Sequence, residues 1–133
     1  MLHIQRSMAG RRVSGFTLIE LLVVMVIIAL LISIAAPRYF NSLEKSKEAV
    51  LRQDLSTMRD AIDKYYGDND KYPDSLDDLV SKKYLRKLPV DPITDSATTW
   101  VVVPPEDPEL GGVFDLHSGA PGNGRDGTPY SSW

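Results

Sequence analysis

The sequence contains no cysteine and only two histidines, His3 and His117. Without a thiol the chain can form no disulfide, and it has no cysteine to act as a nucleophile or a metal ligand. The histidines belong to no Ser/His/Asp set and to no metal-ligand spacing, and no glycine-rich phosphate loop opens a helix. We therefore predict that the protein is not an enzyme and that His117 is a surface residue of a strand.

An excess of basic residues is also missing. The chain has 15 lysines and arginines against 18 aspartates and glutamates, for a net charge of −3. Three of the basic residues are Arg6, Arg11 and Arg12, so residues 16–133 hold 12 basic and 18 acidic side chains, a net charge of −6. Because an acidic chain is repelled by a phosphate backbone, we expect no nucleic-acid partner.

The chain has instead one long apolar run. Residues 16–36 contain a single ionisable side chain, Glu20, and the run ends directly before Pro37. As a helix it would be roughly 31 Å long, enough to cross the apolar core of a bilayer. The arginines upstream predict that the N-terminus stays in the cytoplasm. A carboxylate in such a run is unfavourable without a specific partner, so Glu20 is a candidate functional residue.

Two segments resemble a known family. The sequence Gly15-Phe16-Thr17-Leu18-Ile19-Glu20, followed by the apolar run, closely resembles the N-termini of type IV pilins and of type II secretion pseudopilins. Residues 84–92, which read Tyr-Leu-Arg-Lys-Leu-Pro-Val-Asp-Pro, resemble a segment of the major pseudopilins within that superfamily. The lack of cysteine agrees with this second resemblance, since many type IV pilins have a C-terminal disulfide.

The resemblance implies processing and assembly. A prepilin peptidase is expected to cut after Gly15, which removes the leader 1–15, and to methylate the new N-terminus at Phe16. The Glu20 carboxylate is expected to neutralise the amine of Phe16 on a neighbouring subunit during assembly. Residues 16–37 would be the transmembrane and assembly helix and residues 38–133 a periplasmic domain. The protein would thus cross the bacterial inner membrane once, with its N-terminus in the cytoplasm.

The function implied by the resemblance is that of a structural subunit of the type II secretion pseudopilus, which helps to export folded proteins across the outer membrane. The expected partners are further copies of the chain, minor pseudopilins, the prepilin peptidase, the inner-membrane assembly platform with its cytoplasmic ATPase, the outer-membrane secretin and membrane lipid. Two alternatives stay open. One is a type IV pilin or minor pilin for adhesion, motility or DNA uptake, and the other is a membrane-tethered binding domain that does not polymerise.

The hydrophobic pattern predicts one long N-terminal helix. Apolar residues spaced by threes and fours continue beyond Pro37, so we expect a single helix over residues 16–66 with Gly67 as its C-cap. Its first half would span the membrane, and its second half would be amphipathic and lie against the exported domain. On the polar face, Glu48 and Arg52 have the spacing of a helical ion pair.

The remaining pattern predicts an α+β fold of pilin type. Ser75 is a good N-cap for a short second helix, with Asp78 at the position that completes a capping box. Residues 98–103 are rich in β-branched side chains, and residues 113–117 alternate between apolar and polar. We expect these two segments to pair as a small antiparallel sheet packed on the long helix.

The C-terminal segment that begins at Ser118 is rich in glycine and proline and has no hydrophobic period. The resemblance implies a loop here that binds calcium through backbone carbonyls and aspartates. The candidate oxygen ligands are Ser118, Asn123 and Asp126, with Asp115 nearby, and Ca²⁺ is the only expected cofactor. The segment departs from the family pattern, which has two adjacent acidic residues where this chain has an isolated Asp126. The alternative is a loop held by the packing of Tyr130 and Trp133.

Overall fold

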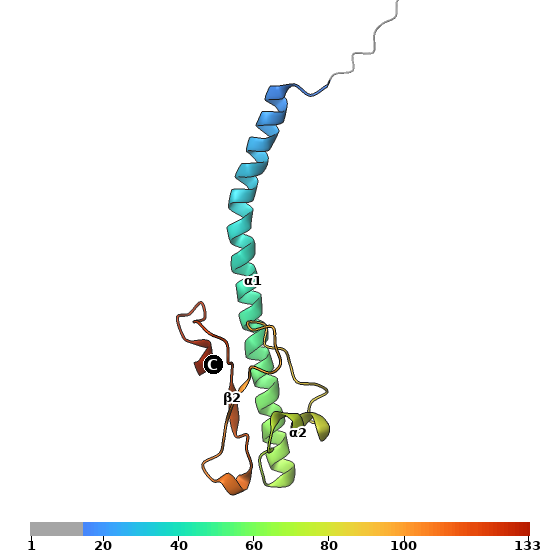
Figure 1. Cartoon of the computed structure of the whole chain (residues 1–133), viewed down its shortest axis with the longest axis vertical. Coiled ribbons are helices and arrows are strands. Elements are labelled where there is room, and N and C mark those ends of the chain that lie inside the picture. The colour runs from blue at the N-terminus through green and yellow to red at the C-terminus, as the bar shows by residue number, and fades with distance from the viewer. Residues whose placement is uncertain (1–14) are drawn as a thin grey trace, which may run out of the picture. The chain divides into compact units, whose positions relative to one another are not determined.

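The computed structural model describes residues 15–133, and the chain divides into two compact units, one ending at Tyr39 and one spanning Phe40–Trp133. Its elements, in chain order, are the helices α1 (Leu18–Asn69) and α2 (Leu76–Ser81), strand β1 (Val101–Val103), the 3₁₀ helix η1 (Pro108–Leu110), strand β2 (Asp115–His117) and the 3₁₀ helix η2 (Tyr130–Ser132) (Figure 1). The predicted α+β class, with a long N-terminal helix and a small antiparallel sheet, is confirmed.

Helix α1 continues through Pro37, as predicted, and the residues on both sides of this proline remain helical. The predicted C-cap is wrong, because Gly67 lies inside the helix, which ends at Asn69. The Asn69 side-chain amide donates a hydrogen bond to the main-chain oxygen of Tyr65 at 2.9 Å. The next residue, Asp70, adopts the left-handed conformation with φ of 55°. Asn69 and Asp70 therefore close the helix in the way expected of a glycine.

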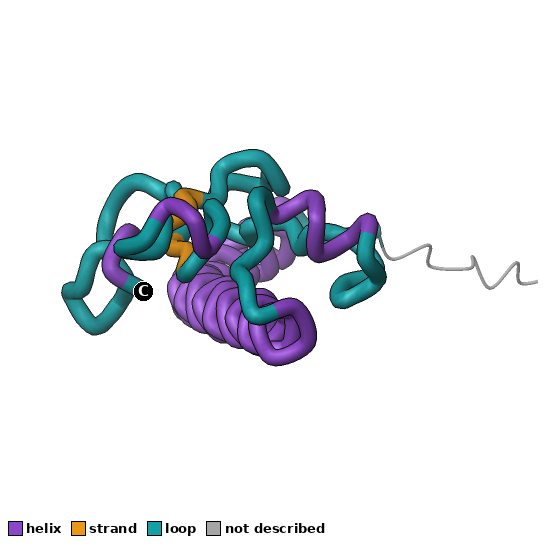
Figure 2. The backbone as a smooth tube through the Cα atoms, turned by 90° about the horizontal axis from the view of Figure 1, so that it is seen from below, coloured by secondary structure: helices purple, strands orange, loops and turns teal. Residues whose placement is uncertain are grey.

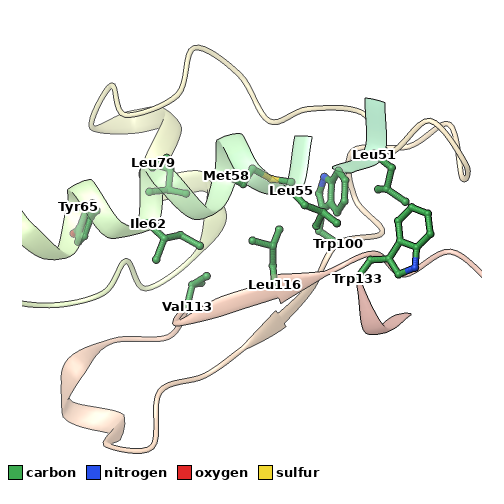
Figure 3. Packing of buried hydrophobic residues seen from close by; sticks show 11 residues of the cluster. Leu51, Leu55, Met58, Ile62, Tyr65, Leu79, Trp100, Val113, Leu116 and Trp133 are labelled. Atoms are coloured by element: carbon green, nitrogen blue, oxygen red, sulfur yellow. The ribbon is translucent and has the colours of Figure 1, made fainter. Parts of the chain in front are cut away.

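The core of the second unit lies between α1 and the segments that follow it. Helix α1 contributes six buried side chains, namely Leu51, Leu55, Met58, Ala61, Ile62 and Tyr65. They pack against Leu79, Trp100, Val113, Leu116 and Trp133 (Figure 3). The predicted amphipathic face is thus confirmed over this stretch. The buried face of α1 begins at Leu51, later than the apolar spacing beyond Pro37 predicts, because Phe40 is 61% exposed and Val50 is 48% exposed.

The two strands form the predicted antiparallel pair, with Val102 opposite Leu116 at its centre. Each strand is shorter than predicted, and residues just before each strand bond to other segments. The indole of Trp100 donates to the main-chain oxygen of Pro89 at 2.9 Å, and the amide of Val113 donates to the main-chain oxygen of Pro73 at 2.9 Å. Leu116 points from β2 onto α1, where it is fully buried (Figure 3).

Helix α2 begins as predicted but is capped differently. Ser75 occupies the N-cap position, yet its side chain makes no capping hydrogen bond. The carboxylate of Asp78 instead accepts from the amide of Asp74 at 3.1 Å, one residue before the position expected in a capping box. Within the second unit, the strands and loops lie along one side of the helix (Figure 2).

Candidate functional site

The first half of α1 exposes a continuous apolar surface. Every large apolar side chain from Leu18 to Ile34 is 45–84% exposed. The helix is long and apolar enough to cross a membrane, and none of its most apolar window is buried within the described residues. Monomeric soluble proteins rarely expose contiguous apolar patches of more than a few hundred Å², and larger ones mark contact with lipid or with other subunits.

The residues of the predicted cleavage site lie directly before this helix. Gly15 and Phe16 are exposed and non-helical, and the Phe16 side chain is 87% exposed. Among residues 15–133, no atom beyond the adjacent residue lies within 4 Å of the position that a Cβ on Gly15 would occupy. Cleavage after Gly15 and methylation of Phe16 stay predictions, and residues 1–14 of the predicted leader lie outside the described part of the chain.

Glu20 lies in the first turn of α1, and the residues before it cap the helix, which the sequence analysis did not predict. Its amide donates to the Thr17 hydroxyl at 3.1 Å, so Thr17 caps the helix. Thr17 and Glu20 have the spacing of a capping box, and a carboxylate is favoured near a helix N-terminus. The sequence Thr-x-x-Glu before an apolar run could have revealed this. The Thr17 hydroxyl therefore caps the helix at the amide of Glu20, and the Glu20 carboxylate lies where a helix N-terminus favours a negative charge.

Two of the three predicted calcium ligands, Ser118 and Asp126, have side chains that contact other protein groups. Ser118 is fully buried and donates from its hydroxyl to the carboxylate of Asp91, which is also fully buried. The same hydroxyl oxygen accepts from the amide of Ala120 at 3.1 Å. Ser118 thus fixes the start of the C-terminal segment to the loop that precedes β1. In this arrangement its hydroxyl serves an internal hydrogen-bond network.

Asp126 has a different set of partners. One of its carboxylate oxygens accepts from the amide of Thr128 at 3.0 Å and from the hydroxyl of Thr128 at 2.6 Å, and the other lies 3.3 Å from the guanidinium of Arg52. These contacts, chiefly those with Thr128, lower the pKa of Asp126 below its usual range. Asn123 forms an isolated backbone bridge with Pro129. Within residues 15–133, no three His, Cys, Asp or Glu side chains gather as a metal site.

The Ser118 and Asp126 side chains do not fit the calcium site that the resemblance implies. The Ser118 hydroxyl is committed to Asp91, and the Asp126 carboxylate already faces a cation, the guanidinium of Arg52. Calcium in proteins is bound by six to eight oxygens, mostly from carboxylates, carbonyls and water. The calcium site stays a prediction, and the contacts of its residues favour another way of closing the loop.

The alternative, in which aromatic packing holds the loop, is found in the structure. The rings of Tyr130 and Trp133 meet edge to face, with 5.0 Å between their centroids. Trp133 is 8% exposed, and its indole donates to the Thr128 hydroxyl at 2.7 Å. The Tyr130 hydroxyl donates to the carboxylate of Glu48 on α1 at 3.2 Å. Burial is the main cause that raises the pKa of Tyr130, and this hydrogen bond is the second.

Comparison with known proteins connects these features to a family. Residues 10–36 match the prokaryotic N-terminal methylation motif. Two proteins named type II secretion system core protein G are similar to the chain over 101 residues, with 36% identity in Aeromonas hydrophila and 37% in Pseudomonas aeruginosa. Each match covers 64% of this chain and 71% of the relative.

A third relative extends the match over more of the chain. The protein of the same name from Escherichia coli K12 is 32% identical over 130 residues, which cover 86% of this chain and 85% of the relative. No solved structure matches the chain. The identities and coverage, together with the methylation motif, the exposed apolar helix and the small α+β unit, place this chain in the family of type II secretion system core protein G.

Proposed function

We propose that this chain is a structural subunit of the type II secretion pseudopilus, which polymerises through the first half of α1. The observation that carries the proposal is the apolar surface between Leu18 and Ile34, where each large side chain is 45–84% exposed. The names of the relatives support the assignment to type II secretion. A structural role also agrees with a sequence in which we find no catalytic constellation.

The same apolar surface would serve in two environments. Before assembly it would lie in the inner membrane, with the arginine-rich N-terminus in the cytoplasm and the second unit in the periplasm. In the filament it would be buried against the helices of other copies, in a heterologous contact that repeats without closing. Removal of the leader by a prepilin peptidase, extraction by the assembly platform and its ATPase, and growth toward the outer-membrane secretin complete the proposed cycle.

Glu20 would guide each incoming subunit. Cleavage after Gly15 would create a positive amine on Phe16, and burial of an unpaired amine among apolar helices is unfavourable by about 3–5 kcal/mol. A Glu20 carboxylate on a neighbour would neutralise it and so fix the axial register between subunits. Because the amide of Glu20 is also bonded to Thr17, a test has to separate the charge of the side chain from the capping of the helix.

The test compares two substitutions in cells that overproduce the protein together with its secretion machinery. Glu20→Gln removes the charge but keeps a residue that suits a capping box. Thr17→Val removes the hydroxyl that caps the helix but keeps Glu20. We expect the Glu20→Gln variant to insert into the membrane normally. The amount of sheared filaments and the amount of secreted protein should fall at least tenfold, because the buried amine of Phe16 would lose its charged partner. Thr17→Val should remain close to the parent protein.

Mass spectrometry of the sheared filaments should find a methylated Phe16 as the first residue. Normal filaments and normal secretion by Glu20→Gln would show that the charge does not set the register. Filaments that form without any effect on secretion would favour a type IV pilin. A membrane-inserted parent protein that forms no filaments when overproduced with the machinery would favour the tethered, non-polymerising domain.

A further inference from the structure

Three charged side chains of α1 reach the C-terminal segment and hold it against the helix. The carboxylate of Glu48 accepts from the amide of Arg125 at 2.8 Å. The guanidinium of Arg52 lies beside Asp126. The guanidinium of Arg59 donates to the main-chain oxygen of Trp133. The segment is therefore attached to the helix at three heights, and each attachment uses a charged side chain of α1.

Arg52 makes two contacts with this segment. Its guanidinium lies 3.3 Å from a carboxylate oxygen of Asp126 and 3.8 Å from the ring centroid of Trp133, which it covers. An arginine above an indole and beside a carboxylate combines a cation–π contact with an ion pair. Because a guanidinium is always protonated in proteins, this positive charge is permanent. Arg52 thus connects the turn at Asp126 with the aromatic pair that ends the described chain.

We propose that Arg52 is the built-in cation of the C-terminal loop, so that the loop of this chain closes without calcium. Asp126 is the only acidic residue in segment 118–133, and Arg125 directly precedes it. A calcium ion at Asp126 would have to displace the Arg52 guanidinium and tolerate two neighbouring positive charges. Calcium affinity depends on the number of charged ligands, and a single carboxylate that is already paired with an arginine binds calcium weakly.

The hydrogen bonds around Asp126 support this arrangement. The amide and the hydroxyl of Thr128 bind one carboxylate oxygen, and the Thr128 hydroxyl also accepts from the indole of Trp133 at 2.7 Å. Trp133 is in turn covered by Arg52. Asp126, Thr128, Trp133 and Arg52 therefore form a closed ring of contacts. Such a ring fixes the conformation of the turn with protein groups alone.

The competing view is that Arg52 is an ordinary surface residue. Its side chain is 59% exposed and that of Asp126 is 50% exposed, and exposed ion pairs often contribute little to stability. The two views differ in what they predict for a neutral side chain at this position and for the response to calcium. Both can be measured on the full-length protein in detergent, with tryptophan fluorescence as the signal, because Trp133 lies at the contact.

The experiment records thermal unfolding in the presence of a calcium chelator and in millimolar Ca²⁺. The variants are Arg52→Gln, Arg52→Lys and, as the matched control, Lys45→Gln, which removes an exposed charge from the same helix. We expect the parent protein to melt at the same temperature in both solutions. Arg52→Gln should melt about 4–8 °C lower in both, the shift for loss of one modest interaction in a domain of this size. Arg52→Lys should lie between the two, and Lys45→Gln should match the parent.

A second variant protects this test against a general folding defect. Asp126→Asn should lower the melting temperature in the same direction, and the double variant with Arg52→Gln should be less destabilised than the sum of the two single variants. A parent protein whose melting temperature falls when calcium is removed would overturn the proposal, as would an Arg52→Gln variant that melts like Lys45→Gln. The measurement involves no assembly, so its result does not depend on the proposed filament role.

Discussion

Replacement of Arg59 by methionine should destabilise the second unit more than any other single charge removal on α1. The guanidinium of Arg59 makes three contacts with the C-terminal half of the chain. It binds the Asp115 carboxylate at 2.9 Å, the main-chain oxygen of Leu116 at 2.8 Å and the main-chain oxygen of Trp133. Methionine keeps much of the apolar stem but leaves all three acceptors without this donor.

The size of the effect follows from the exposure of these groups. A hydrogen bond to a charged group contributes about 1.5–3 kcal/mol when well shielded. The side chains of Arg59 and Asp115 are 36% and 33% exposed, so water can replace part of what is lost. We therefore expect Arg59→Met to lower the free energy of unfolding by about 2 kcal/mol in total. That corresponds to a fall of about 8–16 °C in melting temperature for a domain of this size.

The assay is thermal unfolding of the full-length protein in detergent, followed by tryptophan fluorescence, with Lys64→Met as the control. Lys64 is an exposed residue of the same helix. Arg59→Lys should show an intermediate loss, because an ammonium group cannot reach three acceptors in the fixed geometry of a guanidinium. A loss below about 0.5 kcal/mol for Arg59→Met, the range of ordinary surface substitutions, would refute the reasoning.

Two further predictions concern α1. Gly67→Ala should raise the free energy of unfolding by about 0.5–1 kcal/mol. Gly67 lies inside the helix, and an added Cβ would meet no atom of the described residues within 4 Å apart from its own stretch of helix backbone. An unchanged or lower melting temperature would contradict this. The pKa of Asp54 is raised, chiefly by burial and to a smaller extent by the negative charge of Asp91. Ionisation of Asp54 therefore destabilises the folded state when the pH rises above the pKa of an aspartate in the unfolded chain, about 3.9. Asp54→Asn should therefore melt higher than the parent at neutral pH, with a difference that shrinks as the pH falls toward the acidic range; melting curves that coincide at neutral pH would argue against it.

The parts of the fold that depend on hydrophobic period were predictable from the sequence. The apolar run that begins at Phe16 and the stripe through Leu55 and Ile62 indicated one helix with an apolar first half and an amphipathic second half. The β-branched residues before Pro104 indicated a strand. These signals are local and repeat over many residues, so no single contact can reverse them.

The ends of elements were harder to predict, because a single hydrogen bond can move them. Gly67 suited a C-cap, yet the Asn69 side chain closes the helix and Asp70 takes the left-handed conformation. Similarly, Ser75 stands at the N-cap position without using its hydroxyl. Asn and Asp tolerate the left-handed conformation better than other residues with a side chain, so composition alone left several possible end points for α1.

The contacts of the charged residues of α1 with the C-terminal segment could not be predicted from the sequence. Glu48 and Arg52 have the spacing of an intrahelical ion pair, but each turns to the C-terminal segment instead, Glu48 to Tyr130 and Arg52 to Asp126. An exposed pair at this spacing contributes only about 0.3–0.5 kcal/mol, so a partner elsewhere in the fold with several contacts prevails. Arg52 directly follows the buried Leu51, just as Arg59 directly follows the buried Met58.

A charged residue next to a buried stripe lies at the rim of the core, where its stem covers apolar surface and its charged group reaches the next layer of chain. That position predicts a tertiary role for Arg52 and Arg59 in place of a solvated face. It does not predict the partner, because the acceptors of Arg59 include main-chain oxygens of Leu116 and Trp133, which every residue type offers equally. Side-chain chemistry can therefore identify the donors in a sequence, whereas main-chain acceptors become identifiable only when the path of the C-terminal segment is known.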